Sequence, residues 1–208
     1  MLIDLHVHTA LGGDAMAAPE DLIDRALALG LDGICVVEHD SYEASETAAL
    51  FGEGSGLVVL RGVEVTTDVG HVLVYGVTDD GWREVAAAGG VVAAQSLVDY
   101  VREAGGVAVA AHPFRNDPTS MEDRLASLVG LLAVEGLNGK ALKSENAAGC
   151  AFANRYGLPI TGGSDAHMPG HVGRCVTTFE RRVETEAELA AELRAGRFAG
   201  RYLLGPTE

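Results

Sequence analysis

The chain has 208 residues, enough for one domain with a substantial buried core. Hydrophobic residues make up 48% and charged residues 22%, as in ordinary globular proteins. Thirty acidic residues against fifteen basic ones give a formal net charge of −15. Because such a surface repels long polyanions, we expect no stable nucleic-acid binding, although bound cations could still attract a small phosphorylated molecule.

The N-terminal residues and the cysteines bear on the compartment of the protein. Residues 1–4 (MLID) begin no basic segment followed by an apolar run, so we expect no signal peptide. No stretch approaches the roughly 18 uninterrupted apolar residues of a membrane-spanning helix. The three cysteines, Cys35, Cys150 and Cys175, are widely spaced, and Cys35 and Cys175 lie in apolar runs, which indicates buried reduced thiols. We therefore expect a cytoplasmic protein without a disulfide and without membrane attachment.

In the first half of the chain, short β-rich or continuous apolar runs predict strands at residues 1–8, 33–38, 57–66 and 71–77. A helix is predicted over residues 19–29, with Pro19 in its first turn and Gly30 as its end. Residues 67–70 (TDVG) have the composition of a hairpin turn between the last two of these strands.

In the second half, strands are predicted at residues 107–111, 131–135, 160–164 and 175–179, and helices at residues 93–104, 120–129, 144–156 and 185–196. Ser120 with Asp123, and Thr185 with Glu188, have the spacing of a capping box at a helix start. Alternation of strands and helices over the whole chain predicts a parallel α/β architecture. With about seven strands the sheet could close as a barrel or stay open; a complete eight-fold barrel typically needs about 250 residues. We expect one domain over residues 1–208, with roughly the last 30 residues as a strand and helix extension.

Two motifs with alternate-residue spacing carry the clearest chemical signal. His6 and His8 lie on the first predicted strand, whose two-residue period points both imidazoles to the same face. Two nitrogens converging on one ion at about 2.0–2.1 Å is the arrangement that a metal needs. Asp165 and His167 repeat this spacing late in the chain. The alternatives are two histidines on a half-exposed strand and a turn with a helix cap.

Further candidate ligands follow other predicted strands. Glu64 lies inside an apolar strand, where a carboxylate is costly to bury unless it is paired or bound to a cation; a salt bridge to Arg61 is the alternative. Asp14, six residues after His8, is a candidate oxygen ligand, and a solvated loop residue on spacing alone. The remaining candidates, each at a strand end, are His39, His71 and His112.

Taken together, these residues lie where catalytic groups gather in α/β proteins, at the carboxyl ends of strands. Five predicted strand ends carry a histidine or a carboxylate. A mixed nitrogen and oxygen donor set without cysteine suits Zn, Mn or Fe better than a closed structural zinc site.

The same motifs resemble those of a known family. The series HVHT (6–9), EHD (38–40), GVE (62–64), His71, His112-Pro113 and GSDAH (163–167) is similar, in order and in strand placement, to the signature of the PHP (polymerase and histidinol phosphatase) family. The resemblance extends from residue 1 to about residue 180. It implies a distorted seven-stranded (β/α) barrel, in the short form without an inserted domain, with a site for up to three metal ions, and phosphoester hydrolysis in many members.

The resemblance also implies a ligand set, carried over position by position. One ion would be held by His6, His8, Glu64 and Asp165, a second by Asp14, His39 and His167, and a third by His71 and His112, with Glu64 bridging the first and the third. Where this chain has Asp14 the family often has histidine. We expect two to three divalent ions per chain and place catalysis at Glu64, Asp165 and His167. Candidate substrate contacts are Arg115, Arg174 and His171, each of which can equally be an ordinary surface residue.

Three functions remain open at this point. The first is a metal-dependent phosphatase or phosphodiesterase acting on a small phosphorylated metabolite or nucleotide through a metal-activated water. The second is an amidohydrolase-type enzyme, a class that also has His-x-His on its first strand but often bridges its metals with a modified lysine. The only lysines here, Lys140 and Lys143, are predicted in a loop or at a helix start, which favours Glu64 as the bridge. The third is a non-catalytic domain that uses metal for stability or regulation.

Overall fold

The computed structural model describes residues 1–86 and 90–205. Within these residues the chain forms nine strands: β1 (Leu2–Val7), β2 (Gly33–Val36), β3 (Val58–Thr66), β4 (His71–Tyr75), β5 (Val107–Ala110), β6 (Ala133–Asn138), β7 (Ile160–Gly163), β8 (Cys175–Phe179) and β9 (Phe198–Tyr202). The α-helices are α1 (Pro19–Ala28), α2 (Glu46–Leu50), α3 (Trp82–Ala86), α4 (Ala94–Glu103), α5 (Lys143–Tyr156) and α6 (Glu186–Arg194). Short 3-10 helices are η1 (Glu43–Ser45), η2 (Glu122–Ser127) and η3 (Pro169–His171). No helix of the described part is long and apolar enough to cross a membrane.

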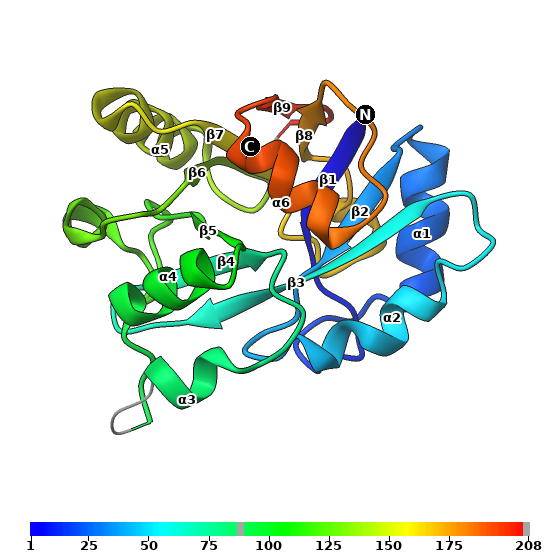
Figure 1. The fold of residues 1–208 in the computed structure, drawn as a ribbon. Helices are drawn as coiled ribbons and strands as arrows, with labels where there is room; N and C mark the ends of the chain where they lie inside the picture. Colours follow the sequence, from blue (N-terminus) through cyan, green and yellow to red (C-terminus); the bar gives the residue numbers. More distant parts are fainter. Residues whose placement is uncertain (87–89, 206–208) are drawn as a thin grey trace.

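All nine strands belong to one strongly curved sheet, in the order β7-β6-β5-β4-β3-β2-β1-β8-β9 (Figure 1). Pairing is parallel from β1 to β3 and from β5 to β7, as predicted from the alternation of strands and helices. The sheet is mixed: β1–β8 and β8–β9 are antiparallel, and so is the pairing on both sides of β4. Between β3 and β4 the reason is the hairpin predicted at residues 67–70, which returns the chain directly beside β3 and leaves no room for a crossover helix.

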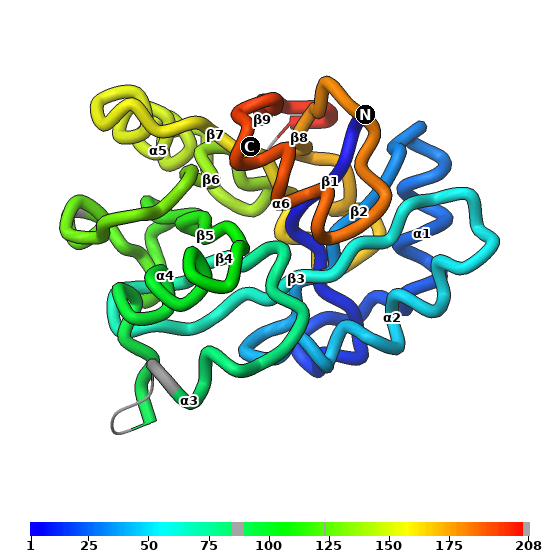
Figure 2. Tube along the Cα trace, in the orientation of Figure 1, coloured from blue at the N-terminus to red at the C-terminus, as the bar shows by residue number. Residues whose placement is uncertain are grey.

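The two ends of the strand series β1–β7 meet. Ala166, three residues after β7, forms a parallel bridge with Val7, and the backbone hydrogen bonds run from His8 N to Ala166 O (2.9 Å) and from Ala166 N to His6 O (3.2 Å). This seam makes a nearly closed barrel, so the predicted barrel class is confirmed. The strand count differs from the expected seven because β8 and β9 extend the sheet beyond β1. Figure 2 shows the N-terminal strand lying beside these C-terminal segments.

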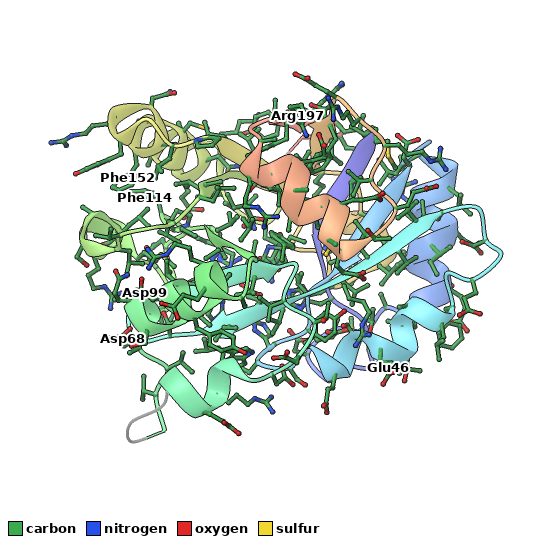
Figure 3. The ribbon with its side chains drawn as sticks, viewed as in Figure 1. Glu46, Asp68, Asp99, Phe114, Phe152 and Arg197 are labelled. Carbon is green, nitrogen blue, oxygen red and sulfur yellow. The ribbon has the colours of Figure 1, made fainter. Side chains whose placement is uncertain are left out.

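Apolar side chains fill the half of the barrel next to α6, and helices cover the outside of the barrel. Its interior contains Leu60, Leu73 and Val109, together with Leu189 and Leu193 of α6, which crosses one end of the barrel and closes it (Figure 1). Outside the wall, α3 and α4 pack on β3 and β4, while α1 packs on β1 and β2. On the flank of α5, Phe152 packs against Phe114 with ring centroids 5.6 Å apart (Figure 3). The interior opposite α6 is left for polar groups.

Several predicted boundaries need correction. Residues 120–129 do not form an α-helix: Ser120 donates its hydroxyl to Pro113 O instead of capping, and the segment forms only η2. The strand predicted at residues 131–135 is shifted to β6, which begins at Ala133. The capping box at Thr185 is confirmed, with Glu188 N donating to Thr185 Oγ1 at 3.2 Å. Helices α2 and α3 and strand β9 were not predicted, because each is short or lies in a weakly patterned segment. All three cysteines are free, and Cys35 and Cys175 are buried as predicted.

Candidate metal centre

An irregularity in β1 turns the two histidines of the first motif into the barrel. Ile3 and Leu5 pack in the barrel interior, and the register of β1 against β2 shifts between Asp4 and Val7. Such a bulge lets the strand change face, so that His6 and His8 point inward although they lie at even positions. Both imidazoles are fully buried, and their Nε2 atoms lie 3.0 Å apart. The prediction that they share a face is confirmed.

Glu64 of β3 lies at the centre of the cluster and is 1% exposed. Its Oε1 faces His112 Nε2 at 2.8 Å and His71 Nδ1 at 2.9 Å, whereas its Oε2 faces His6 Nε2 and His8 Nε2, both at 3.1 Å, and His39 Nε2 at 3.6 Å. One carboxylate therefore separates two groups of histidines.

The salt bridge between Glu64 and Arg61 is not formed. Arg61 donates from Nε to Ser45 Oγ at 3.0 Å and from Nη2 to Tyr42 O at 2.9 Å. Residues three apart on a strand point to opposite faces of the sheet, so Arg61 lies outside the barrel wall and Glu64 inside it. This alternative for Glu64 is wrong.

Asp165 joins the cluster from the turn after β7. It is 2% exposed and its backbone is in the left-handed region, with φ of 52°. Its Oδ1 lies 3.4 Å from His167 Nδ1 and 3.8 Å from the Nε2 atoms of both His6 and His8, and its Oδ2 lies 4.0 Å from His112 Nε2. The Asp165 side chain therefore faces the histidines of the cluster, from a turn whose left-handed backbone is strained.

Asp14 is the most exposed member of the cluster, with 34% of its side chain accessible. Its Oδ2 lies 3.1 Å from His167 Nε2 and 3.3 Å from His39 Nε2. Burial alone would raise its pKa, but the hydrogen bonds from His167 and His39 outweigh burial and lower it. Asp14 is therefore in contact with the cluster, contrary to the isolated loop residue that spacing alone favoured.

The donor atoms of the cluster are arranged so that they could hold metal. Sets of three donors that lie within 4.8 Å of one another are His6–His8–Glu64, His6–His112–Asp165, His8–Asp165–His167, His8–Asp14–His39 and His39–Glu64–His71. Each of the nine predicted ligands belongs to at least one set. Two ring nitrogens that face each other at 3.0 Å, as in His6 and His8, need a cation or a proton between them. Nitrogen and oxygen donors without thiolates suit Zn, Mn or Fe.

Electrostatics show the same demand for positive charge. Burial would lower the pKa of His6, but Glu135, Glu64 and Asp165 outweigh it and hold that pKa well above its usual value. In the same way, burial opposes but hydrogen bonds to Glu38 and Glu64 raise the pKa of His8 to about 9. Burial would raise the pKa of Glu64, yet His6, His112 and His71 hold it well below its usual range. In the absence of metal, protonated imidazoles provide the positive charge that balances these carboxylates.

Two buried carboxylates behind the cluster were not among the predicted site residues. Glu135 Oε1 lies 2.9 Å from His6 Nδ1, and its Oε2 accepts from the backbone N–H of His112 at 3.0 Å. Glu38 Oε1 accepts from both the backbone N–H (3.1 Å) and the hydroxyl (2.6 Å) of Thr9. The signal that could have revealed the role of Glu135 is the one used for Glu64, an acidic residue in an apolar strand.

The three predicted substrate contacts lie along one side of the site but differ in their distance from it. Arg115 forms ion pairs with Asp165 and with Asp117. Arg174 Nη1 donates to Gly139 O at 3.3 Å, and His171 lies at the end of η3, in the loop between β7 and β8. Through its ion pair with Asp165, Arg115 contacts a member of the histidine and carboxylate cluster directly.

Comparison with known proteins places the chain among related sequences and folds. Residues 143–198 match the family model PHP_C, described as PHP-associated. An uncharacterized protein of Methanocaldococcus jannaschii is 21% identical over 138 residues, which are 62% of this chain and 77% of that protein. An error-prone DNA polymerase of Cutibacterium acnes is 31% identical over 98 residues, or 41% of this chain but only 9% of the polymerase.

Solved structures share the fold. A two-domain protein from Bacteroides vulgatus containing a predicted PHP-like metal-dependent phosphoesterase superposes with a TM-score of 0.74 at 18% identity, covering 97% of this chain and 64% of that one. PsfC from Pseudomonas syringae gives a TM-score of 0.74 at 23% identity, covering 97% and 91%. An amidohydrolase from Chromobacterium violaceum, solved with sulfate and no metal, gives 0.63 at 20% identity, covering 81% and 88%.

Proposed function

We propose that this chain is a metal-dependent hydrolase that cleaves phosphate esters. Its C-terminal family match and its PHP-like structural neighbours support membership of the PHP family. The observation that carries the proposal is the position of Glu64, with two histidines 2.8–2.9 Å from one carboxylate oxygen and two others 3.1 Å from the second. A carboxylate placed in this way is suited to bridge two ions.

The proposed ligands are the nine residues of the cluster, and the proposed load is two to three Zn, Mn or Fe ions per chain. When bound, such ions would activate a water molecule and neutralise the oxygens of a phosphate group. The proposed catalytic residues are Glu64 and Asp165, each of which belongs to two donor sets, and His167, which shares a donor set with Asp165.

Residues of the chain orient these donors. If His6 donates its Nδ1 hydrogen to Glu135, its Nε2 lone pair faces Glu64 and the centre of the cluster. The same Glu135 carboxylate fixes the backbone of His112, so one side chain positions ligands from two strands. A carboxylate that accepts a hydrogen bond from the other ring nitrogen of a metal-ligating histidine typically raises the basicity of that histidine and holds its ring in place.

Burial indicates the direction from which a substrate enters. His6, His8 and Glu64 are essentially inaccessible, whereas the side chains of His39 and Asp14 are 31% and 34% exposed. The buried members exclude water on the inner side of the cluster, and the substrate approaches from the side of Asp14 and His39. We propose a small phosphorylated metabolite or nucleotide as the substrate, since the net charge of −15 disfavours long polyanions.

The amidohydrolase alternative has one observation in its favour. Lys140 Nζ lies 3.5 Å from Asp165 Oδ1, so a lysine is closer to the cluster than its predicted loop position suggested. However, Lys140 reaches Asp165 at the edge of the cluster, while Glu64 occupies the centre between the histidines. This favours a carboxylate bridge and therefore the phosphoesterase. A purely regulatory metal site is disfavoured because the donors are partly open to solvent at Asp14 and His39.

A panel of phosphate monoesters, phosphate diesters, amides and lactones, each assayed with Mn, Zn and Fe, tests the proposal. We expect turnover of phosphoesters and none of simple amides or lactones. Hydrolysis of amides without any phosphoesterase activity would favour the amidohydrolase instead. Absence of all activity in protein loaded with metal would favour the regulatory domain.

A further inference from the structure

Two cations from different loops converge on Asp165. Arg115, after β5, forms an ion pair with Oδ2, and Lys140, after β6, places Nζ 3.5 Å from Oδ1. The Arg115 side chain is 18% exposed and that of Lys140 is 35% exposed, so both can be reached by a small molecule. Lys140 is one of only two lysines in a chain with a net charge of −15, and it lies beside the cluster.

The loop that carries Lys140 is fixed by the wall of the site. Asn138 Oδ1 accepts from the backbone N–H groups of Lys140 (2.9 Å) and Ala141 (3.1 Å), and Asn138 Nδ2 donates to Glu135 at 2.9 Å. One asparagine thus joins the lysine loop to the carboxylate that orients His6 and His112. Because this network is buried, the backbone of Lys140 is preorganised.

Close packing of Gly139 holds the same loop against the turn of Asp165. Gly139 N donates to Gly163 O at 3.0 Å, and a Cβ at Gly139 would come within 2.7 Å of Ser164 O. The backbone of Lys140 is therefore fixed at a position from which its side chain reaches Asp165.

Further positive charge lies on this side of the site. Burial lowers the pKa of His171, and the positive charges of Arg174, Lys140 and His167 lower it further. These groups are thus near enough to His171 to act on one imidazole. The surroundings of Asp165 away from the barrel interior are strongly cationic in an otherwise acidic protein.

This charge pattern selects among phosphate esters. A metal ion bound to Asp165 would neutralise that carboxylate and leave Lys140 and the Nη1 end of Arg115 available for an anion, while Arg115 Nε keeps its pair with Asp117. A phosphate monoester carries close to two negative charges at neutral pH, because its second pKa is about 6, whereas a diester carries one. We propose that Lys140, together with Arg115, binds the phosphoryl group of the substrate and makes the site selective for monoesters over diesters. The inference rests on the proposed phosphoesterase function.

Binding of inorganic phosphate tests the role of Lys140 without turnover. Calorimetric titration would compare metal-loaded wild type with Lys140→Met, with the charge-preserving Lys140→Arg, and with Lys143→Met at the other lysine of the chain as the matched control. We expect Lys140→Met to weaken phosphate binding roughly 10- to 100-fold, the loss of one charge-assisted contact. Lys140→Arg should restore most of the affinity, and Lys143→Met should leave it unchanged. Wild-type phosphate affinity in Lys140→Met at equal metal content would mean that Lys140 only balances Asp165, and would overturn the proposal.

A matched pair of esters tests the selectivity. For p-nitrophenyl phosphate, Lys140→Met should lower kcat/KM by roughly 10-fold or more, mainly through KM; for bis(p-nitrophenyl) phosphate it should lower it less than about 3-fold. Equal preference of the wild type for the two esters, or an equal loss on both in the variant, would overturn the assigned selectivity. If neither ester is hydrolysed, the proposed function fails, and the phosphate titration still decides whether Lys140 binds the anion.

Discussion

Glu135 lies directly behind His6, with its Oε1 2.9 Å from His6 Nδ1, and neither side chain is accessible to solvent to any important extent. The carboxylate also accepts the backbone N–H of His112. A single buried group therefore determines how imidazoles from β1 and from the end of β5 face the cluster. The geometry of the centre depends on this residue even though it belongs to none of the donor sets found among the described residues.

Substitution Glu135→Gln should weaken metal binding while the protein stays folded. The amide is nearly isosteric but lacks the charge that supports the His6 ring, and loss of such a partner typically costs roughly 10- to 100-fold in metal affinity. Titration with Zn or Mn in a competing chelator measures the change. The exposed Glu53→Gln is the matched control and should bind metal like wild type. Unchanged affinity in Glu135→Gln would show that Glu135 does not support the ligands.

Substitution Glu64→Gln should abolish hydrolysis and leave the fold intact. The amide preserves packing, but it removes the negative charge that lies between the two groups of histidines, and loss of a metal-positioned nucleophile should cost factors of hundreds or more. Activity per folded chain and metal content, measured on the same preparation, give the answer. Normal turnover at normal metal loading would mean that Glu64 is not a bridging ligand.

Protein purified without chelators should carry more than one transition-metal ion per chain. Nine donors are too many for a single tetrahedral ion, and the donor sets overlap only partly. Elemental analysis of native and reconstituted protein measures the ratio. A reproducible value of one or less after reconstitution would contradict a multinuclear centre.

Substitution Asp14→Ala should remove one ion and leave the others bound. Asp14 lies closest to the more exposed His39 and His167, at 3.3 and 3.1 Å, so the ions held by buried donors should keep their ligands. Metal content per chain should fall by about one ion, because the proposed assignment gives Asp14, His39 and His167 to a single ion. Asp24→Ala on the exposed face of α1 serves as the control. Loss of all ions in Asp14→Ala would show that the sets do not bind independently.

Metal-free protein should lose stability as the pH rises from about 6.5 to about 9. The pKa of His8 is raised from 6.5 to about 9 in the folded state, so its contribution is fully present below 6.5 and is lost as the pH passes through 9. The raised pKa of His6 acts in the same direction. Thermal denaturation after chelation should show Tm falling by roughly 5 °C or more across this window. In metal-loaded protein the trend should reverse, because ligands bind as neutral imidazoles. A flat or rising Tm in the metal-free protein would contradict these pKa shifts.

The positions of the site residues could be predicted because they follow a local rule. Histidines and carboxylates at strand ends, such as His39 and His112, converge wherever parallel strands share one edge. The two-residue period of a strand also predicted that His6 and His8 share a face. It did not predict the bulge in β1 that turns this face into the barrel. The role of Glu135 was not predicted, although its position in an apolar strand gave a local signal, because its partner His6 lies 129 residues away. The contact of Lys140 with Asp165 spans 25 residues, and no local pattern reveals it.

The fold was predictable to the level of its class and family resemblance. Alternating apolar runs and helical patterns gave most elements, and the turn at residues 67–70 gave the β3–β4 hairpin. The helix expected at residues 120–129 failed because Ser120 bonds to Pro113 in tertiary structure. Strand β9 pairs with β8 from beyond α6, and its half-exposed residues lack the apolar alternation that marks a strand.

The seam between β1 and Ala166 has a consequence for how the protein is made. The hydrogen bonds of His8 and His6 to Ala166 join segments about 160 residues apart, and Asp4 adds a contact to Ser164 N at 2.8 Å. During synthesis the first histidines leave the ribosome before their partners in the turn after β7, which are translated about 160 residues later. Contacts of such long sequence separation form late and slowly. The donors of β1 and those of the turn after β7 therefore come together only once the chain has been made as far as that turn.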